Sequence, residues 1–270
     1  MTLTKRQEEI LLYLYRFRFL NRSQIQKLLG HKSFNRIIIW LNQLTTQNYI
    51  HRYYNPKTVT IAAQYSLGLK SRKYLLEKAE ENEKRKKDGK KRNGTVIIQP
   101  HLLNRIWREH TLSEQFHTHC LFLADIYLSL VALVTKTKAK LYFFTKTDLY
   151  PHDYMPTPLP DAYIAIKERN GKTKRYFLDV FDPLPPRMIL RRRINQYVDY
   201  FDDNTWQETT DHPFPQIILV CPDERSKRYL HRFIQKTLEY SDLEFFLTTW
   251  ELVKTKGMCR EALEKVEGAE

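Results

Sequence analysis

The stretch LPDAYIAIKERNGKTKRYFLDVFDP, residues 159–183, places two carboxylates where they could do chemistry together. Asp161 stands at the start of one apolar run, and Asp179 lies inside a second run that follows a short polar turn. Two such runs predict neighbouring strands. Carboxylates on neighbouring strands can hold Mg²⁺, which orients a phosphodiester and an attacking water. Asp161 and Asp179 are therefore the candidate metal ligands, and they are catalytic only if the site is active.

Hydrolysis at such a site also needs a cation, and the position two residues after Asp179 is Phe181. Because side chains alternate along a strand, Phe181 shares a face with Asp179 and puts a bulky apolar ring beside it, where a cation could support the attacking water. Lys167 lies six residues beyond Asp161, roughly 20 Å along an extended strand, which is too far to serve the same metal. We therefore expect a site that does not cleave.

Three other side chains stay open as members of this site. Arg187 and Arg191 form an i, i+4 pair on the helix predicted to follow, and Glu114 could supply a third acid from an earlier helix. The alternative role of Asp161 and Asp179 is structural, as a pair of acids neutralised by these arginines. On that expectation the protein needs no cofactor, and Mg²⁺ enters only if the site is an active nuclease.

The pattern around these acids predicts the elements that must position them. A helical region covers about residues 102–135, and residues 187–201 and 224–238 predict two further helices. Strands are expected at KLYFFTKT (140–147), DAYIAIK (161–167), RYFLDVF (175–181), PQIILVC (215–221) and LEFFLTTWEL (243–252). Helix, three strands, helix, strand is the core order of the restriction-endonuclease-like fold, an α/β arrangement with a mixed sheet flanked by helices.

The first 76 residues predict a different, smaller domain. Residues 4–19 put Ile10, Leu11, Leu14 and Phe17 on one helical face behind a capping box of Thr4 and Gln7. Two short helices follow, at about 21–30 and 31–47, with Gly30 closing the first and Phe34 opening an apolar stripe on the second. Residues 50–67 predict a hairpin with its turn at Asn55 and Pro56. Three helices and a hairpin make a winged helix-turn-helix.

In a winged helix-turn-helix the third helix enters the major groove of duplex DNA and the wing contacts the backbone. Arg36 could pair with guanine, Asn and Gln with adenine, and Ile39 could meet a thymine methyl group. Ile39 could instead belong to a dimer interface, and a polar outer face is ordinary for any soluble helix. The candidate DNA contacts are Lys32, Ser33, Asn35, Arg36, Ile39, Asn42 and Gln43 on or before this helix, with Arg52 and Lys57 on the wing.

The positive charge is concentrated in this part of the chain. The net charge is +14, and residues 1–76 hold 13 Lys and Arg against Glu8 and Glu9, which is +11. Residues 77–94 add +3 as eight basic and five acidic side chains, and the 24 charges of each sign from residue 95 onward cancel. A basic segment attached to a neutral body is typical of a protein that meets a polyanion, with nucleic acid the first candidate.

The whole chain resembles the replication-relaxation family of plasmid and mobile-element proteins. PDAYIAI followed by RYFLDVF is similar to the PD-(D/E)XK nuclease motif, with Asp161 and Asp179 as its acids and Phe181 in place of its lysine. REHTLSEQF at 108–116 and RRRINQYVDYF at 191–201 are similar to two further helices of that family. The resemblance implies a role linked to plasmid replication and a degraded nuclease-like domain.

The sequence argues against a fold stabilised by disulfides or zinc and against a membrane protein. Cys120, Cys221 and Cys259 are odd in number, widely spaced and without a CxxC pair, so neither a disulfide framework nor a structural zinc site is indicated. The apolar stretch 121–134 is too short for a membrane span and contains an acid, and no signal peptide opens the chain. We expect a cytoplasmic protein without a membrane partner.

The resulting domain prediction is a winged helix over residues 1–76, a helix end and basic linker over 77–98, a nuclease-like domain over 99–256 and a tail over 257–270. The function hypothesis is a double-stranded DNA-binding protein of a plasmid or mobile element, acting in replication or transcription control. A Mg²⁺-dependent endonuclease targeted by the winged helix is the alternative. A third hypothesis is an adaptor whose second domain docks partners, which could include replication or mobilisation proteins and a second copy of the chain.

Overall fold

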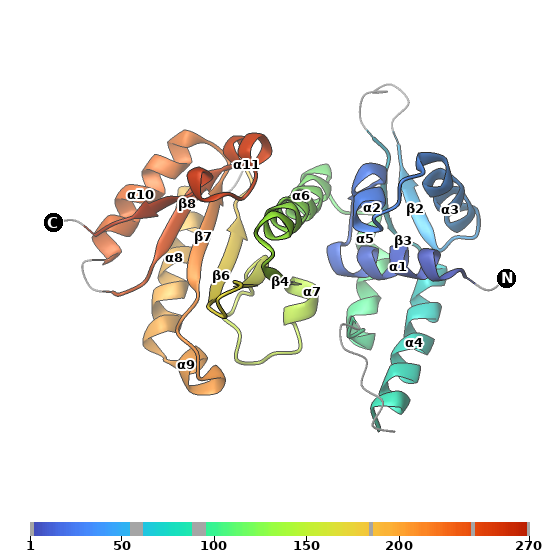
Figure 1. Ribbon diagram of the computed structural model, residues 1–270, viewed down its shortest axis with the longest axis horizontal. Coiled ribbons are helices and arrows are strands. Elements are labelled where there is room, and N and C mark those ends of the chain that lie inside the picture. Colours follow the sequence, from blue (N-terminus) through green and yellow to red (C-terminus); the bar gives the residue numbers. More distant parts are fainter. Residues whose placement is uncertain (1–2, 55–61, 88–95, 184–185, 239–240, 269–270) are drawn as a thin grey trace. The chain divides into compact units, whose positions relative to one another are not determined.

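The computed structural model describes residues 3–54, 62–87, 96–183, 186–238 and 241–268. Close packing divides the chain into two compact units, Met1–Leu128 and Ser129–Glu270, and each is described by itself (Figure 1). The division falls inside helix α6, Glu114–Thr137. The domain boundaries expected from the sequence, at residues 76, 98 and 256, remain predictions.

The first unit opens with the elements of a winged helix-turn-helix in their expected order. These are α1 (Lys5–Phe17), β1 (Leu20–Asn21), α2 (Arg22–Leu28), α3 (Phe34–Thr46), β2 (Ile50–Tyr53) and β3 (Gln64–Leu67). The three strands form an antiparallel sheet in the order β1-β3-β2. The turn expected at Asn55 and Pro56 lies outside the described residues, but the pairing of β2 with β3 confirms the hairpin.

Local sequence explains where these helices begin and end. The capping box of Thr4 and Gln7 is present at the start of α1, and Ile10, Leu11 and Leu14 on its inner face are fully buried. After α2 the chain turns at Gly30, whose φ of +59° is a left-handed conformation that glycine adopts without a steric penalty. These local signals set the angle at which α3 follows α2.

Four further helical elements complete the first unit: α4 (Leu69–Lys87), the 3₁₀ helix η1 (Pro100–Arg105), α5 (Ile106–Glu109) and the first half of α6. The single helical region expected over 102–135 is therefore broken at residues 110–113. At 24 residues, α6 is longer than the apolar stretch 121–134 from which no membrane span was expected, and by length and composition alone it is long enough to cross a membrane. Phe122, Ala124 and Ile126 of α6 are buried.

The second unit is built on a six-stranded mixed sheet in the order β4-β5-β6-β7-β8-β9. Its strands are β4 (Lys140–Thr145), β5 (Ala162–Lys167), β6 (Thr173–Val180), β7 (Gln216–Cys221), β8 (Phe245–Thr249) and β9 (Glu264–Val266). The pairs within β4-β5-β6 and β8-β9 are antiparallel, and those within β6-β7-β8 are parallel. β9 comes from the segment expected to be a tail, so that expectation is wrong for Glu264–Val266.

Helices α8 (Arg187–Asp202) and α10 (Glu224–Leu238) cover one face of this sheet, as Figure 1 shows. Phe177, Leu219 and Phe245 of the three central strands are buried in one core cluster with side chains of both helices. Three short helices, α7 (Lys146–Leu149), α9 (Thr205–Thr210) and α11 (Trp250–Lys256), and the 3₁₀ helix η2 (Arg260–Ala262) connect the strands. The fold class expected from the sequence, a mixed sheet flanked by helices behind a winged helix, is confirmed.

Candidate functional site

The two candidate acids lie next to each other in the second unit. Asp161 immediately precedes β5, Asp179 lies in β6, and the register Ala162↔Leu178 puts the two acids side by side. The backbone N–H of Asp161 donates to Asp179 Oδ1 at 3.3 Å. Both are buried, with 3% and 6% of their surface exposed. Two buried carboxylates this close need positive partners, since their charges repel in a low-dielectric site.

Lys146 is the cation beside Asp161. Its Nζ lies 2.6 Å from Asp161 Oδ1, and the other carboxylate oxygen, Oδ2, accepts from the backbone N–H of Val180 at 2.7 Å. Lys146 is the first residue of α7 and follows directly on β4. Its own backbone N–H also donates to the carbonyl of Asp161. Asp161 therefore holds both the backbone and the side chain of Lys146.

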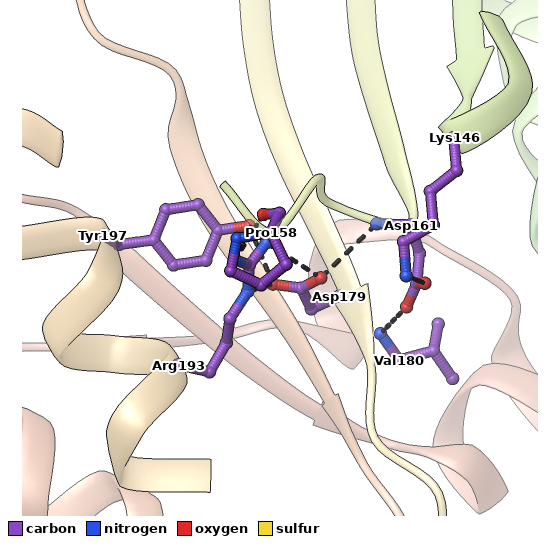
Figure 2. Close-up of polar contacts among 7 residues, drawn as sticks. All are labelled: Lys146, Pro158, Asp161, Asp179, Val180, Arg193 and Tyr197. Atoms are coloured by element: carbon purple, nitrogen blue, oxygen red, sulfur yellow. Dashed lines mark hydrogen bonds and ion pairs between the residues drawn. The ribbon is translucent and has the colours of Figure 1, made fainter. Parts of the chain in front are cut away.

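Arg193 and Tyr197 of α8 hold Asp179 from the other side (Figure 2). Arg193 Nε donates to Asp179 Oδ2 at 2.6 Å and Nη2 donates to Oδ1 at 3.3 Å, so the guanidinium binds the carboxylate in a bidentate geometry. The Tyr197 hydroxyl donates to Oδ2 at 2.7 Å. The remaining guanidinium nitrogen, Nη1, donates to the carbonyl of Pro158 at 2.6 Å. The arginine therefore uses all three of its nitrogens inside the protein.

The electrostatics of the network favour its charged, hydrogen-bonded form. Burial by itself lowers the pKa of Lys146 and Arg193, but the carboxylates of Asp161 and Asp179 outweigh burial and raise both pKa values above their usual range. Burial, followed by the charge of Asp179, raises the pKa of the Tyr197 phenol well above its usual value. At neutral pH Lys146 and Arg193 therefore carry their charges, and the Tyr197 hydroxyl keeps its proton and acts as a donor.

This donor set does not fit a divalent metal ion. All four oxygens of Asp161 and Asp179 already accept hydrogen bonds, and each carboxylate has its own cation. Within the described ranges no group of three or more His, Cys, Asp or Glu side chains could hold a metal. A metal would have to displace Lys146 or Arg193, and we derive no hydrolytic step through it.

Phe181 occupies the position expected for it. It directly follows β6, and its side chain is buried in the same core cluster as Phe177 and Tyr197, on the face where Arg193 meets Asp179. Its backbone is held as well, because the N–H donates to Val220 O and the carbonyl accepts from Trp250 Nε1, both at 2.9 Å. The place of the motif lysine is filled by the hydrophobic core.

The partners expected for the acids were Arg187 and Arg191, and that expectation is wrong. Arg187 and Arg191 lie on the exposed side of α8, each with its guanidinium 4.8 Å from the ring centroid of Tyr229 on α10. Arg193 is the partner, because it lies on the buried side of the helix with Leu190 and Tyr197. Glu114 is exposed in the first turn of α6, in the other unit, and its role as a third acid stays a prediction.

On α3 the candidate DNA-contacting side chains form an exposed surface. Ser33 is the N-cap and accepts from the backbone N–H of Arg36 at 3.3 Å. None of the ion pairs or side-chain hydrogen bonds found in the described part of this unit uses Asn35, Arg36 or Asn42. The exposed candidates are Lys32, Ser33, Asn35, Arg36, Ile39, Asn42 and, on β2, Arg52. We call these seven residues the α3 surface.

Two side chains of this region differ from the simple helical projection. Gln43 is half-buried, and its Oε1 accepts from Gln7 Nε2 of α1 at 2.9 Å. Phe34, expected on the apolar stripe, is 45% exposed with the Arg22 guanidinium 4.1 Å from its ring centroid. Phe34 lies in the first turn of α3, beyond the reach of the core that buries Ile37 and Leu41. Lys57 lies outside the described residues.

Comparison with known proteins adds little to this geometry. No protein-family model and no curated protein matches the chain. Among solved structures, the restriction endonuclease FokI matches at 11% sequence identity and a TM-score of 0.31, over 97% of this chain. This chain spans 48% of the length of that structure. A likeness at this level carries no argument, so the fold assignment rests on the order and pairing of the elements described above.

Proposed function

We propose that this protein binds double-stranded DNA sequence-specifically through its winged helix and acts in replication or transcription control of a plasmid or mobile element. The observation that carries the proposal is the α3 surface. Its members on α3 itself are an arginine, two asparagines and an exposed isoleucine, the groups that recognise guanine, adenine and the thymine methyl in the major groove. The link to a plasmid or mobile element comes from the family resemblance of the sequence.

The electrostatic surroundings support the proposal. Residues 1–76 have a net charge of +11, and Lys32, Arg36 and Arg52 have no carboxylate partner among the described residues of the first unit. Cations that are not neutralised internally remain available to phosphates. Phosphate contacts fix the position of a protein on DNA, and base contacts then select the sequence.

The experiment that tests the proposal is selection of bound fragments from a random duplex library by the full chain. We expect a defined motif, and binding to that motif that weakens steeply as salt rises, since each neutralised phosphate releases counterions. A library that stays random after repeated selection, or binding that is insensitive to salt, would contradict the proposal.

The second candidate is a Mg²⁺-dependent endonuclease, and Lys146 is the observation in its favour, since it brings an ammonium group to Asp161. Against it, Phe181 fills the motif position and Arg193 holds Asp179. A nicking assay on supercoiled plasmid with Mg²⁺ or Mn²⁺ separates the two. We expect no nicking; metal-dependent nicking that disappears in Asp179→Ala would make the endonuclease the better proposal.

A further inference from the structure

A groove between α8 and α10 gathers cations that neither the winged helix nor the carboxylate site uses. Its volume is about 420 Å³, and six of the eight residues that line it are basic. These six, which we call the groove cations, are exposed: Arg187, Arg191, Arg225, Arg228, Arg232 and Lys236. None of the described residues that line the groove is acidic. The zero net charge of residues 95–270 therefore conceals a strongly positive surface.

The groove cations are not neutralised by the rest of the second unit. The ion pairs of its described residues use other cations, and none of the six takes part in one. Lys227, on the same helix, shows the contrast, because it lies 2.6 Å from Glu264 of β9 and is 12% exposed. On α10 the charge that faces the sheet is paired, and the charge that faces the groove is not.

Two of the arginines are held in place by aromatic rings. The guanidinium of Arg191 lies 4.8 Å from the ring centroid of Tyr229 and 5.0 Å from that of Phe233, and Arg187 stacks on Tyr229 as well. A stacked guanidinium keeps its N–H edge free, and that edge matches two oxygens of a phosphate. The rings thus limit the rotamer entropy that these side chains lose when they bind an anion.

The spacing of the cations favours a ligand with repeated negative charge. Arg228, Arg232 and Lys236 are four residues apart on α10, which places successive cations about 6 Å from each other along the helix. A single phosphate or carboxylate would use only two or three of the six groove cations. A nucleic-acid strand presents a phosphate about every 3.4 Å along the duplex axis and can meet the whole row.

We propose that this groove binds the phosphate backbone of a nucleic-acid strand, as a sequence-independent contact separate from the α3 surface. An acidic membrane surface is flat, whereas these cations line both walls of a groove. Arginine, five of the six groove cations, also suits phosphate oxygens better than a point charge does. The contact does not depend on α3, because it involves only residues of the second unit.

The test uses the full chain and a short fluorescent duplex of arbitrary sequence, titrated over a range of salt concentrations. Each lost phosphate contact lowers the salt slope of binding by about 0.9. The triple variant Arg228→Gln/Arg232→Gln/Lys236→Gln should therefore lower that slope by about 2 to 3. The matched control, Lys167→Gln/Arg169→Gln/Lys172→Gln, removes the same charge from exposed positions around the β5–β6 turn and should change the slope by less than about 1.

Equal slopes for the two triple variants, or no duplex binding by the parent chain at all, would overturn the groove proposal. So would loss of binding to phosphatidylserine vesicles in the first variant with an unchanged DNA slope, which would assign the groove to a membrane surface. All substituted side chains are exposed, and a circular dichroism melt verifies folding. If the triple variant does not fold, Arg232→Gln alone should still lower the slope by about 1.

The result is separable from the test of the winged helix. Sequence preference that is unchanged in Arg36→Ala, with an intact groove effect, would contradict only the role of α3. If the parent binds DNA sequence-specifically and the triple groove variant has the same salt slope as the parent, only the groove proposal is contradicted.

Discussion

The α3 surface of the first unit and the carboxylate site of the second unit differ in what surrounds their polar side chains. Asn35, Arg36 and Asn42 are exposed and make no side-chain hydrogen bond with the described residues. Asp161 and Asp179 are buried, and each of their oxygens accepts from a donor of the same unit. These three side chains of the first region leave their hydrogen-bonding groups open to solvent, whereas the carboxylate site uses its hydrogen-bonding capacity internally.

This difference assigns opposite roles to the charges of the two regions. Removing a side chain from the α3 surface leaves no buried group unpaired, so the fold should not change and binding should. Removing Asp179 or Arg193 leaves the other charge buried without its partner, so stability should fall and DNA binding by the winged helix should persist. The predictions below test this separation.

The largest effect is expected for Asp179→Ala. Arg193 and Asp179 are each 8% exposed at the side chain, and removal of one partner from a buried ion pair costs about 3 to 5 kcal/mol of unfolding free energy. Denaturant unfolding measures the loss, and the matched control is Asp199→Ala, which removes an exposed acid from α8, the helix that carries Arg193. DNA affinity at temperatures where the variant is folded should stay within a few-fold of the parent.

Two outcomes would remove the distinction between the regions. One is an Asp179→Ala variant as stable as Asp199→Ala, which would mean that the pair does not hold the fold. The other is an Asp179→Ala variant that folds but loses DNA affinity. The double variant Asp179→Leu/Arg193→Met removes both charges and should recover part of the lost stability.

The next effect concerns recognition by α3. Arg36→Ala should reduce discrimination between the selected site and random duplex by about 1 to 3 kcal/mol, because it removes a base contact. Arg52→Ala, on the wing strand β2, should weaken binding to both duplexes about equally, because it removes a phosphate contact. Fluorescence titrations with the two duplexes measure both. If Arg36→Ala weakened both equally, the α3 surface would not contact bases.

Much of the fold could be predicted from local patterns, and the identity of the acids could be predicted as well. The alternation of apolar and polar residues and the helical periodicity are both visible within a single segment, so they predicted α1, α8, α10 and the central strands. Asp161 and Asp179 stand out because acids are rare at the ends and in the interior of apolar strands.

The partners of these acids could not be predicted, because they depend on tertiary register. Lys146 reaches Asp161 only since β4 pairs with β5 in the register Thr145↔Ala162, which places residues 146 and 161 opposite each other. Arg193 was missed because a helical projection assigns charged residues to the solvent side. Here the buried arginine is stabilised by Asp179, which no pattern within α8 reveals.

The pH dependence of stability gives a smaller and more specific test. The pKa of Tyr197 is raised by burial and by Asp179, so the phenol keeps its proton in the folded protein at a pH where it ionises in the unfolded chain, above about 10. Its contribution to stability is complete below that pH and is lost as pH rises toward the folded pKa. Between pH 10 and 11 the parent should lose about 1 kcal/mol more than Tyr197→Phe does. Identical alkaline slopes would contradict the buried hydrogen bond to Asp179.

The smallest effect is expected for Lys146→Met, although Lys146 is as close to Asp161 as Arg193 is to Asp179, at 2.6 Å in each pair. The Lys146 side chain is 56% exposed, so water can take its place beside the carboxylate, and the loss should be about 0 to 1 kcal/mol and should decrease as salt rises. Denaturant unfolding at low and high salt measures it. A loss as large as that of Asp179→Ala would show that water does not replace Lys146 beside the buried Asp161. A small loss would mean that exposure, rather than the distance between the charged atoms, separates the two halves of the carboxylate site.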